Sequence, residues 1–207
     1  MKKIFLLDVD STLINEEVID LLAAQAGVSK EVTEITSSAM AGELDFSESL
    51  VKRVSLLAGL SITAIEQVQK KITLTNGAAD LITALQSRGD IVAVVSGGFT
   101  EIISPLLATL KISRFKANSL EIIEGQLTGK VNGEIVDRRA KAEFLKELVA
   151  LSGIPLSNTV AIGDGANDID MIQSAGIGVA FCAKPALVNV ADRVINTRDL
   201  REVLKVI

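Results

Sequence analysis

The chain has 207 residues and a formal net charge of −5, with one cysteine and no histidine. These counts exclude Ser-His-Asp triads, histidine phosphotransfer and zinc sites built from histidines or several cysteines. No stretch approaches the roughly 20 apolar residues of a membrane span and no Lys/Arg cluster stands out, so we expect neither a membrane nor a nucleic acid as partner. An apolar N-terminal run interrupted at Asp8, together with the lone cysteine, predicts a cytoplasmic protein.

The first predicted strand covers residues 4–10 and is followed by residues 14–76, which contain no strand-like run. Asp45 and Glu48 have the D-x-x-E spacing of an N-cap and its N3 partner, which marks a helix start. We therefore predict that residues 14–76 form a small helical cap domain, inserted into a catalytic core of residues 1–13 and 77–207. Helical patterns within this segment cover residues 16–26, 30–41, 45–58 and 62–72.

Beyond residue 76, short aliphatic runs alternate with helical patterns. Near-continuous apolar strands separated by helices are typical of a parallel sheet covered on both faces, so the sequence predicts an α/β fold with a Rossmann-like parallel sheet. Residues 117–136 instead alternate apolar and polar with glycine breaks, which predicts a β-hairpin at the sheet edge. The other strands are predicted at residues 91–98, 159–168, 177–183 and 193–197, and helices at 78–88, 99–110 and 140–152.

Two aspartates, Asp8 and Asp10, end the first apolar strand. Because they lie two residues apart, an extended backbone directs both to one side, in the crevice where α/β folds bind ligands. Carboxylates this close raise each other's pKa, which is costly unless a cation sits between them or one of them keeps a proton. An ionised aspartate can act as a nucleophile, and a protonated neighbour can act as a general acid.

Two other strand ends add groups that suit a metal and a phosphate. The sequence GDGAND contains Asp164 and Asp168, which with Asp8 make an oxygen-rich cluster suited to Mg²⁺. SGG at 96–98 supplies a hydroxyl and flexible backbone N–H groups of the kind that cradle phosphate, and Lys141 can supply a positive charge. Each of these residues alone is more often a turn former, a helix cap or a solvated side chain. Their combination predicts an active site.

These motifs together resemble those of the haloacid dehalogenase-like phosphohydrolases and, within that superfamily, the phosphoserine phosphatases, over essentially the whole chain. The matching residues are D-x-D-S-T at 8–12, Ser96, Lys141 and G-D-G-x-N-D at 163–168. The resemblance implies that Asp8 is a nucleophile that becomes an aspartyl phosphate. It also implies that Asp10 protonates the departing oxygen and then takes a proton from the attacking water.

The resemblance further implies a Mg²⁺ cofactor. Asp8, Asp164 and the main-chain carbonyl of Asp10 would coordinate the ion, and the carboxylate of Asp168 would support these ligands from behind.

The resemblance also implies which residues hold the substrate. Ser96, Gly97 and Lys141 would bind the phosphoryl group. Gly98 and Asn167 would complete the pocket.

Residues of the predicted cap domain indicate which substrate we expect. Phe46, Leu50 and Arg53 are spaced i, i+4, i+7 and share one helix face, which alone would suit an ordinary helix with an exposed arginine. In the phosphoserine phosphatases the matching positions bind the amino-acid part of the substrate. The resemblance therefore implies that Glu17 binds its ammonium group and Arg53 its carboxylate, while Met40 and Phe46 close the pocket.

The expected function is Mg²⁺-dependent hydrolysis of a small phosphomonoester, O-phospho-L-serine, to L-serine and phosphate in serine biosynthesis, by a monomer or homodimer. Three alternatives stay open. They are transfer of the phosphoryl group to homoserine, action on another small metabolite, and a non-catalytic module that senses phosphate or metal. The presence of Asp10 counts against the sensing module, because a mere phosphate acceptor does not need an acid for the leaving group.

Overall fold

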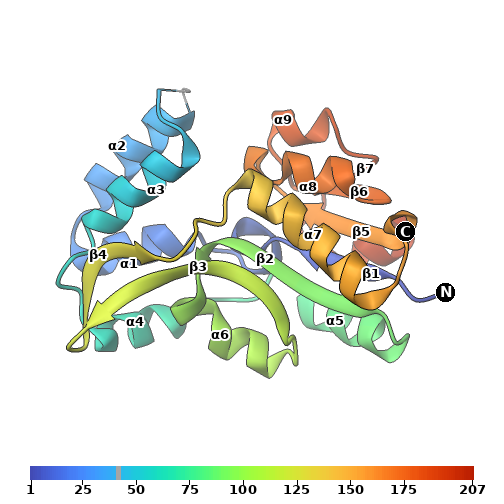
Figure 1. Ribbon diagram of the computed structural model, residues 1–207, viewed down its shortest axis with the longest axis horizontal. Helices are drawn as coiled ribbons and strands as arrows, with labels where there is room; N and C mark the ends of the chain where they lie inside the picture. The colour runs from blue at the N-terminus through green and yellow to red at the C-terminus, as the bar shows by residue number, and fades with distance from the viewer. Residues whose placement is uncertain (41–42) are drawn as a thin grey trace.

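The computed structural model describes residues 1–40 and 43–207 without the side chain of Met40, so the role expected of Met40 lies outside the described residues. The described strands form one seven-stranded sheet in the order β4-β3-β2-β1-β5-β6-β7 (Figure 1). All neighbouring strands are parallel except β3 and β4, which form an antiparallel hairpin at one edge, and this confirms the predicted α/β fold. The strands are β1 (Ile4–Leu7), β2 (Ile91–Phe99), β3 (Arg114–Ile123), β4 (Gln126–Asn132), β5 (Thr159–Gly163), β6 (Ile177–Phe181) and β7 (Arg193–Ile195).

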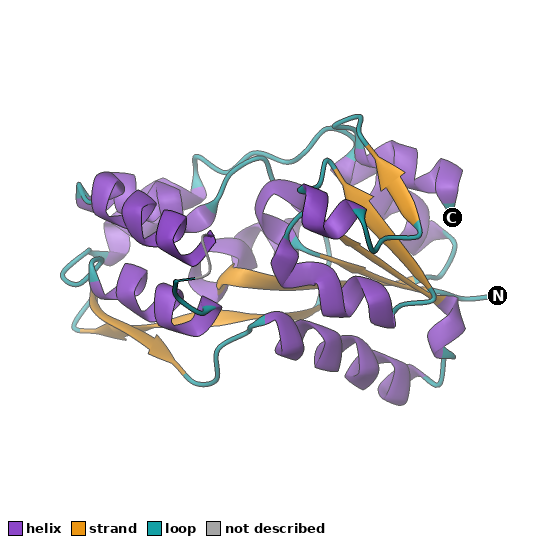
Figure 2. Ribbon diagram, turned by 90° about the horizontal axis from the view of Figure 1, so that it is seen from above, coloured by secondary structure: helices purple, strands orange, loops and turns teal. Residues whose placement is uncertain are grey.

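Helices cover both faces of the sheet (Figure 2). Phe5 and Leu7 of β1 pack into one hydrophobic cluster, whereas Ile4 and Leu6 pack into the other, and all four are fully buried. Burial on both faces explains why this strand is one continuous apolar run. Among the described residues, every helix is too short or too polar to cross a bilayer. The helices after residue 76 are α5 (Ala78–Ser87), α6 (Thr100–Thr109), α7 (Arg138–Ser152), α8 (Ile169–Ser174), α9 (Pro185–Val188) and α10 (Val203–Val206).

In the described part of the chain, four α-helices lie between β1 and α5, which directly precedes β2, and α2 and α3 rise above one end of the sheet in Figure 1. Backbone hydrogen bonds tie the connection between α3 and α4 to the hairpin. The Gly59 N–H donates to the Leu127 carbonyl at 2.8 Å, and the Leu127 N–H donates to the Leu60 carbonyl at 2.9 Å. The hairpin therefore extends beyond the sheet to support the helices. The four helices between β1 and α5 are α1 (Val18–Ala26), α2 (Ser29–Met40), α3 (Phe46–Ser55) and α4 (Ile62–Gln69).

The first strand is shorter than predicted. β1 stops at Leu7, and Val9–Leu13 forms a tight helical turn in which Ser11 has a φ of 55°. The predicted continuation of the strand through Asp10 is therefore wrong, because the chain turns at this point, although Asp8 and Asp10 still face the same cavity, as predicted. β5, β6 and β7 also end before their predicted last residues, since the chain turns away as soon as it leaves the sheet.

The start of α3 offers a direct test of a local stabilising interaction. The Asp45 carboxylate accepts a hydrogen bond from the Glu48 backbone N–H at 2.8 Å, as the D-x-x-E spacing predicted. We expect Asp45→Ala to lower the free energy of unfolding by about 1 kcal/mol, because this N–H loses its partner. Urea denaturation measures the change. Asp45→Asn is the matched control, and a loss as large as that of the alanine variant would contradict the capping role.

Candidate active site

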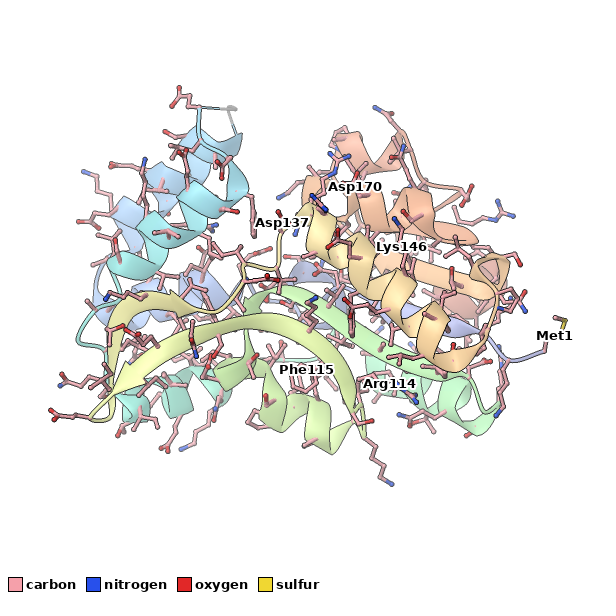
Figure 3. The ribbon with its side chains drawn as sticks, viewed as in Figure 1. Met1, Arg114, Phe115, Asp137, Lys146 and Asp170 are labelled. Atoms are coloured by element: carbon pink, nitrogen blue, oxygen red, sulfur yellow. The ribbon has the colours of Figure 1, made fainter. Side chains whose placement is uncertain are left out.

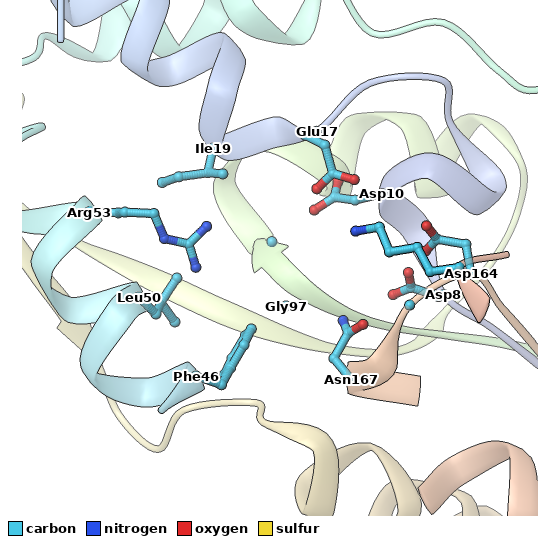
Figure 4. A pocket seen from close by; sticks show the side chains of 13 residues that line it. Asp8, Asp10, Glu17, Ile19, Phe46, Leu50, Arg53, Gly97, Asp164 and Asn167 are labelled. Atoms are coloured by element: carbon cyan, nitrogen blue, oxygen red, sulfur yellow. The ribbon is translucent and has the colours of Figure 1, made fainter. Parts of the chain in front are cut away.

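A cavity of about 100 Å³ lies between the carboxyl ends of β1, β2 and β5 and the helices α1 and α3 (Figure 4). Pockets for drug-sized ligands typically measure roughly 300–1,000 Å³, so this cavity suits a small metabolite. Sequence segments that lie far apart contribute to it. Its lining residues are Asp8, Asp10, Glu17, Ile19, Phe46, Leu50, Arg53, Gly97, Gly98, Asp164, Gly165, Asn167 and Lys184.

Three of the expected site residues, Ser96, Lys141 and Asp168, are completely buried behind this lining. The Lys141 ammonium donates hydrogen bonds to Asp8 Oδ1 at 2.6 Å and to Asp168 Oδ1 at 2.7 Å. The second oxygen of Asp168 accepts from the backbone N–H groups of Asp164 and Gly165, at 3.1 and 3.2 Å. Asp168 thus connects Lys141 to the turn that carries Asp164.

The environment perturbs the ionisation of Asp8 and Lys141 in a connected way. Burial and the charge of Asp168 raise the pKa of Asp8 well above its usual range, whereas the positive charge of Lys141 opposes this rise. Burial alone would lower the pKa of Lys141, but the carboxylates of Asp168 and Asp8 outweigh it and raise that pKa. Lys141 therefore stays charged and favours the ionised form of Asp8.

Asp8, Asp164 and Asp168 can place one carboxylate oxygen each within 4.8 Å of one another. Burial, followed by the charge of Asp168, raises the pKa of Asp164 to about 6. In addition, Asp10 Oδ1 is buried and has no hydrogen-bond partner among the described residues. An acidic cluster of this kind, made of oxygen donors alone, fits a hard divalent cation such as Mg²⁺ better than zinc.

The environment of Asp10 favours its protonated form. Burial, and next the charge of Glu17, raise the pKa of Asp10 to about 8, against the opposing charge of Lys141. A carboxyl with this pKa carries a proton at neutral pH and can donate it in a reaction. Asp8 and Asp10 thus differ in environment, since only Asp8 contacts Lys141 in the described residues.

The SGG turn leaves little room beside the two aspartates. The Gly98 N–H donates to Ser96 Oγ at 2.8 Å. A Cβ atom on Gly98 would lie 3.0 Å from Asp10 Oδ2 and from Ser96 Oγ, and one on Gly97 would lie 3.1 Å from Phe46 Cζ. A side chain at either position would therefore crowd groups that line the cavity.

Phe46, Leu50 and Arg53 all line the cavity from one face of α3, as their spacing predicted. Burial lowers the pKa of Arg53, and its Nε donates to the Ser49 carbonyl at 3.2 Å. Opposite α3, Glu17 lies at the start of α1 beside Asp10 (Figure 4), and Glu17 Oε1 accepts from the Ser11 hydroxyl at 2.6 Å. The cavity thus has one cationic and one anionic group on its helical side.

Lys184, which follows β6, lines the cavity but was not predicted as a site residue. Its backbone N–H donates to the Asp164 carbonyl at 2.9 Å, and its charge lowers the pKa of Asp164 against the larger effect of burial. The sequence did contain a signal for Lys184. It follows a predicted parallel strand, and the carboxyl end of that strand had to lie at the same sheet edge as Asp8 and Asp164. Ile19, which also lines the cavity, was not singled out either.

A family model described as haloacid dehalogenase-like hydrolase matches residues 5–173. The match includes Asp8, Asp10, the SGG turn, Lys141 and the GDGAND turn. The chain belongs to the haloacid dehalogenase-like hydrolases.

Relatives within this family have a more specific name. The phosphoserine phosphatase of Methanocaldococcus jannaschii is 50% identical over 206 residues, which are 100% of this chain and 98% of that protein. The phosphoserine phosphatase of Streptomyces coelicolor is 51% identical over 203 residues, or 98% of this chain, and this chain spans 50% of that longer relative. A solved structure, described as a phospho-aspartyl intermediate analogue of phosphoserine phosphatase, is 50% identical and has a TM-score of 0.94, covering 100% of this chain and 99% of that chain.

The acidic cluster predicts that a divalent cation stabilises the protein more as the pH rises. The pKa values of Asp164 and Asp10 are raised to about 6 and about 8, so each carboxyl binds protons more tightly in the folded than in the unfolded state. Their favourable contribution is therefore present at low pH and is lost as the pH rises through these values. A bound cation offsets the part of this loss that comes from Asp164, because it binds the deprotonated carboxylate of that residue.

We accordingly expect Mg²⁺ added to EDTA-treated protein to raise Tm by several degrees more at about pH 8 than at about pH 5. Differential scanning calorimetry measures both shifts. Asp164→Asn should show a small shift at either pH. An equal Mg²⁺-induced shift at both pH values in the unaltered protein would contradict the carboxylate cluster as the binding site.

Proposed function

We propose that the chain hydrolyses O-phospho-L-serine to L-serine and phosphate, through an aspartyl-phosphate intermediate and with Mg²⁺ as its cofactor. The observation that carries this proposal is the different environment of two neighbouring carboxyls. Asp8 accepts a 2.6 Å hydrogen bond from buried Lys141, whereas Asp10 has a pKa of about 8 and retains a proton. The similarity to phosphoserine phosphatases over the whole chain supports the choice of substrate.

In the first half of the reaction, a carboxylate oxygen of Asp8 attacks phosphorus and the bond between phosphorus and the serine oxygen breaks. Asp10 donates its proton to that oxygen, since a serine alkoxide is a poor leaving group. In the second half, a water molecule attacks the phosphorus, and Asp10 now takes the proton of that water. The bond between Asp8 and phosphorus breaks, so both aspartates return to their starting states.

The Mg²⁺ ion would be held by the carboxylates of Asp8 and Asp164 and by the main-chain carbonyl of Asp10. When bound, the ion supplies positive charge that stabilises the negative charge on the phosphoryl oxygens. Asp168 acts from behind this site. It holds Lys141 through one oxygen and the Asp164 turn through the other, and so it keeps two groups of opposite charge in place.

The phosphoryl group would lie against Ser96, Gly97 and Lys141. Ser96 supplies a hydroxyl, Gly97 permits close approach of the backbone, and Lys141 supplies a charge that is already desolvated. Because these groups are fixed before the substrate arrives, they need little reorganisation in the transition state. Gly98 and Asn167 would complete the pocket.

Residues 14–76 would act as a cap domain over a core formed by residues 1–13 and 77–207. The guanidinium of Arg53 is suited to the substrate carboxylate, and Glu17 is suited to its ammonium group. Phe46 packs beside Gly97 and would limit the size of the substrate. These three side chains surround a cavity of about 100 Å³, which favours a short amino acid over a sugar or a peptide.

Steady-state release of phosphate from L-phosphoserine tests the proposal directly. We expect turnover that needs Mg²⁺, stops in excess EDTA and falls by more than about 1,000-fold in Asp8→Asn, because the amide is not a nucleophile. No release from any phosphomonoester by folded protein would overturn hydrolysis and favour a sensing module. Formation of phosphohomoserine on adding homoserine would identify a phosphotransferase instead.

A second experiment tests how the amino-acid end is recognised. We expect Arg53→Met to raise KM for phosphoserine by about 10- to 100-fold, because a charge-assisted hydrogen bond to the carboxylate is lost. Hydrolysis of p-nitrophenyl phosphate, which has no carboxylate, should change little. Lys52→Met is the matched control, since Lys52 is an exposed neighbour on α3 that does not line the cavity. Equal losses on both substrates would contradict the role of Arg53.

A further inference from the structure

The SGG turn bulges out of the sheet. β2 and β3 pair in register up to Ser96 and Ala117, and the next pair joins Phe99 with Asn118. Gly97 and Gly98 are therefore left without partners in β3, and both line the cavity. A bulge interrupts the ladder hydrogen bonds, so other groups must hold the peptides within it.

The side chain of Asn118, on β3, holds this bulge. Asn118 is 1% exposed. Its Nδ2 donates to the Gly97 carbonyl at 2.8 Å, and its Oδ1 accepts from the Val136 N–H at 2.8 Å. A carbonyl only accepts and an N–H only donates, so these two partners determine the orientation of the amide. An aspartate of the same size could satisfy only Val136.

The Gly97–Gly98 peptide is consequently held at both ends. The Asn118 side chain donates to the Gly97 carbonyl, and the Gly98 N–H donates to Ser96 Oγ at 2.8 Å. Because the Ser96 oxygen accepts this bond, the hydroxyl must direct its own proton elsewhere, and within the described residues Ser96 Oγ donates no hydrogen bond. The hydrogen bond from Asn118 also polarises the peptide and strengthens the bond to Ser96.

Asn118 also connects this turn to the helix that carries Lys141. Val136 directly precedes Asp137, which is labelled in Figure 3 at the start of α7 and caps it by accepting from the Ala140 N–H at 2.8 Å. Lys141 lies in the first turns of the same helix. One buried amide therefore joins the two segments that bring Ser96 and Lys141 to the site.

We infer that Asn118 is a positioning residue for phosphate binding: through the Gly97–Gly98 peptide it orients the Ser96 hydroxyl as a donor to a phosphoryl oxygen. The inference rests on the proposed function, because it takes a phosphoryl group as the ligand. Asn118 does not line the cavity, so it acts on the ligand only through other groups.

Binding of inorganic phosphate to the Mg²⁺-loaded protein, measured by isothermal titration calorimetry, tests this inference without turnover. We expect Asn118→Asp to raise the Kd for phosphate about 10- to 100-fold and to leave the Kd for Mg²⁺ unchanged, because the metal ligands do not contact Asn118. Ser119→Ala is the matched control. It removes the 2.6 Å bond from the next residue to Glu101, away from the turn, and should change the Kd for phosphate by less than about twofold.

A double-mutant cycle separates positioning from a general structural role. If Asn118 acts through Ser96, then Asn118→Asp should add almost nothing to the loss already caused by Ser96→Ala. Additive losses would overturn the inference, as would unchanged phosphate affinity in folded Asn118→Asp. Should the aspartate variant not fold, Asn118→Ser, which introduces no charge, is used in the same cycle with the same criteria.

The two proposals fail in different ways. If the unaltered protein does not hydrolyse phosphoserine yet loses phosphate affinity in Asn118→Asp, the proposed substrate is wrong and the role of Asn118 stands. If it hydrolyses phosphoserine and the variant binds phosphate as tightly as before, the role of Asn118 is overturned and the function stands.

Discussion

Lys141 carries a positive charge that is completely removed from solvent and lies between the carboxylates of Asp8 and Asp168, at 2.6 and 2.7 Å. Moving such ions out of water costs several kcal/mol each, and a well-packed apolar group of the same volume is often at least as stable. The arrangement is therefore better explained by chemistry than by stability. Lys141 opposes the rise in the pKa of Asp8 that burial and Asp168 cause, and so favours its ionised form, while Asp168 fixes the turn that presents Asp164.

This ion cluster depends on the topology of the sheet. β1 is central, with β2 on one side and β5 on the other, and the chain continues outward from both neighbours. A crevice opens at the carboxyl ends of the strands where the order reverses in this way. Asp8, the SGG turn and Asp164 all lie at this point. Lys141 reaches the crevice from α7, which covers one face of the sheet. The acidic cluster is thus built on rigid strand ends rather than on a long loop.

The chemical and the recognising parts of the site come from different elements. Apart from Lys141, which comes from α7, the groups suited to phosphoryl transfer follow the strands of the sheet, whereas Glu17, Phe46 and Arg53 come from α1 and α3. The long β3–β4 hairpin links the two parts. At its far end it bonds to the α3–α4 connection through Leu127, and nearer the sheet Asn118 holds the turn that contains Gly97. A single hairpin therefore supports both the helices and the phosphate-binding turn, which places them in a defined relation to each other.

Much of this organisation is local and was predictable. Three features depend only on residues near one another in the chain, so local sequence patterns predicted them. They are the apolar runs, the D-x-x-E helix start at Asp45, and the face shared by Phe46, Leu50 and Arg53. The acidic and glycine-rich strand ends also identified the site, because parallel strands must bring their carboxyl ends to one edge.

Other features depend on contacts between residues that are far apart in the chain. Lys141 looks like an ordinary surface lysine in the sequence, and its burial depends on a partner 133 residues away. Asn118 likewise gave no signal, since its partners Gly97 and Val136 belong to other segments. The turn after Leu7, rather than an extended strand, directs the two aspartates. Burial and long-range pairing are properties of the assembled fold, and no local pattern of residues encodes them.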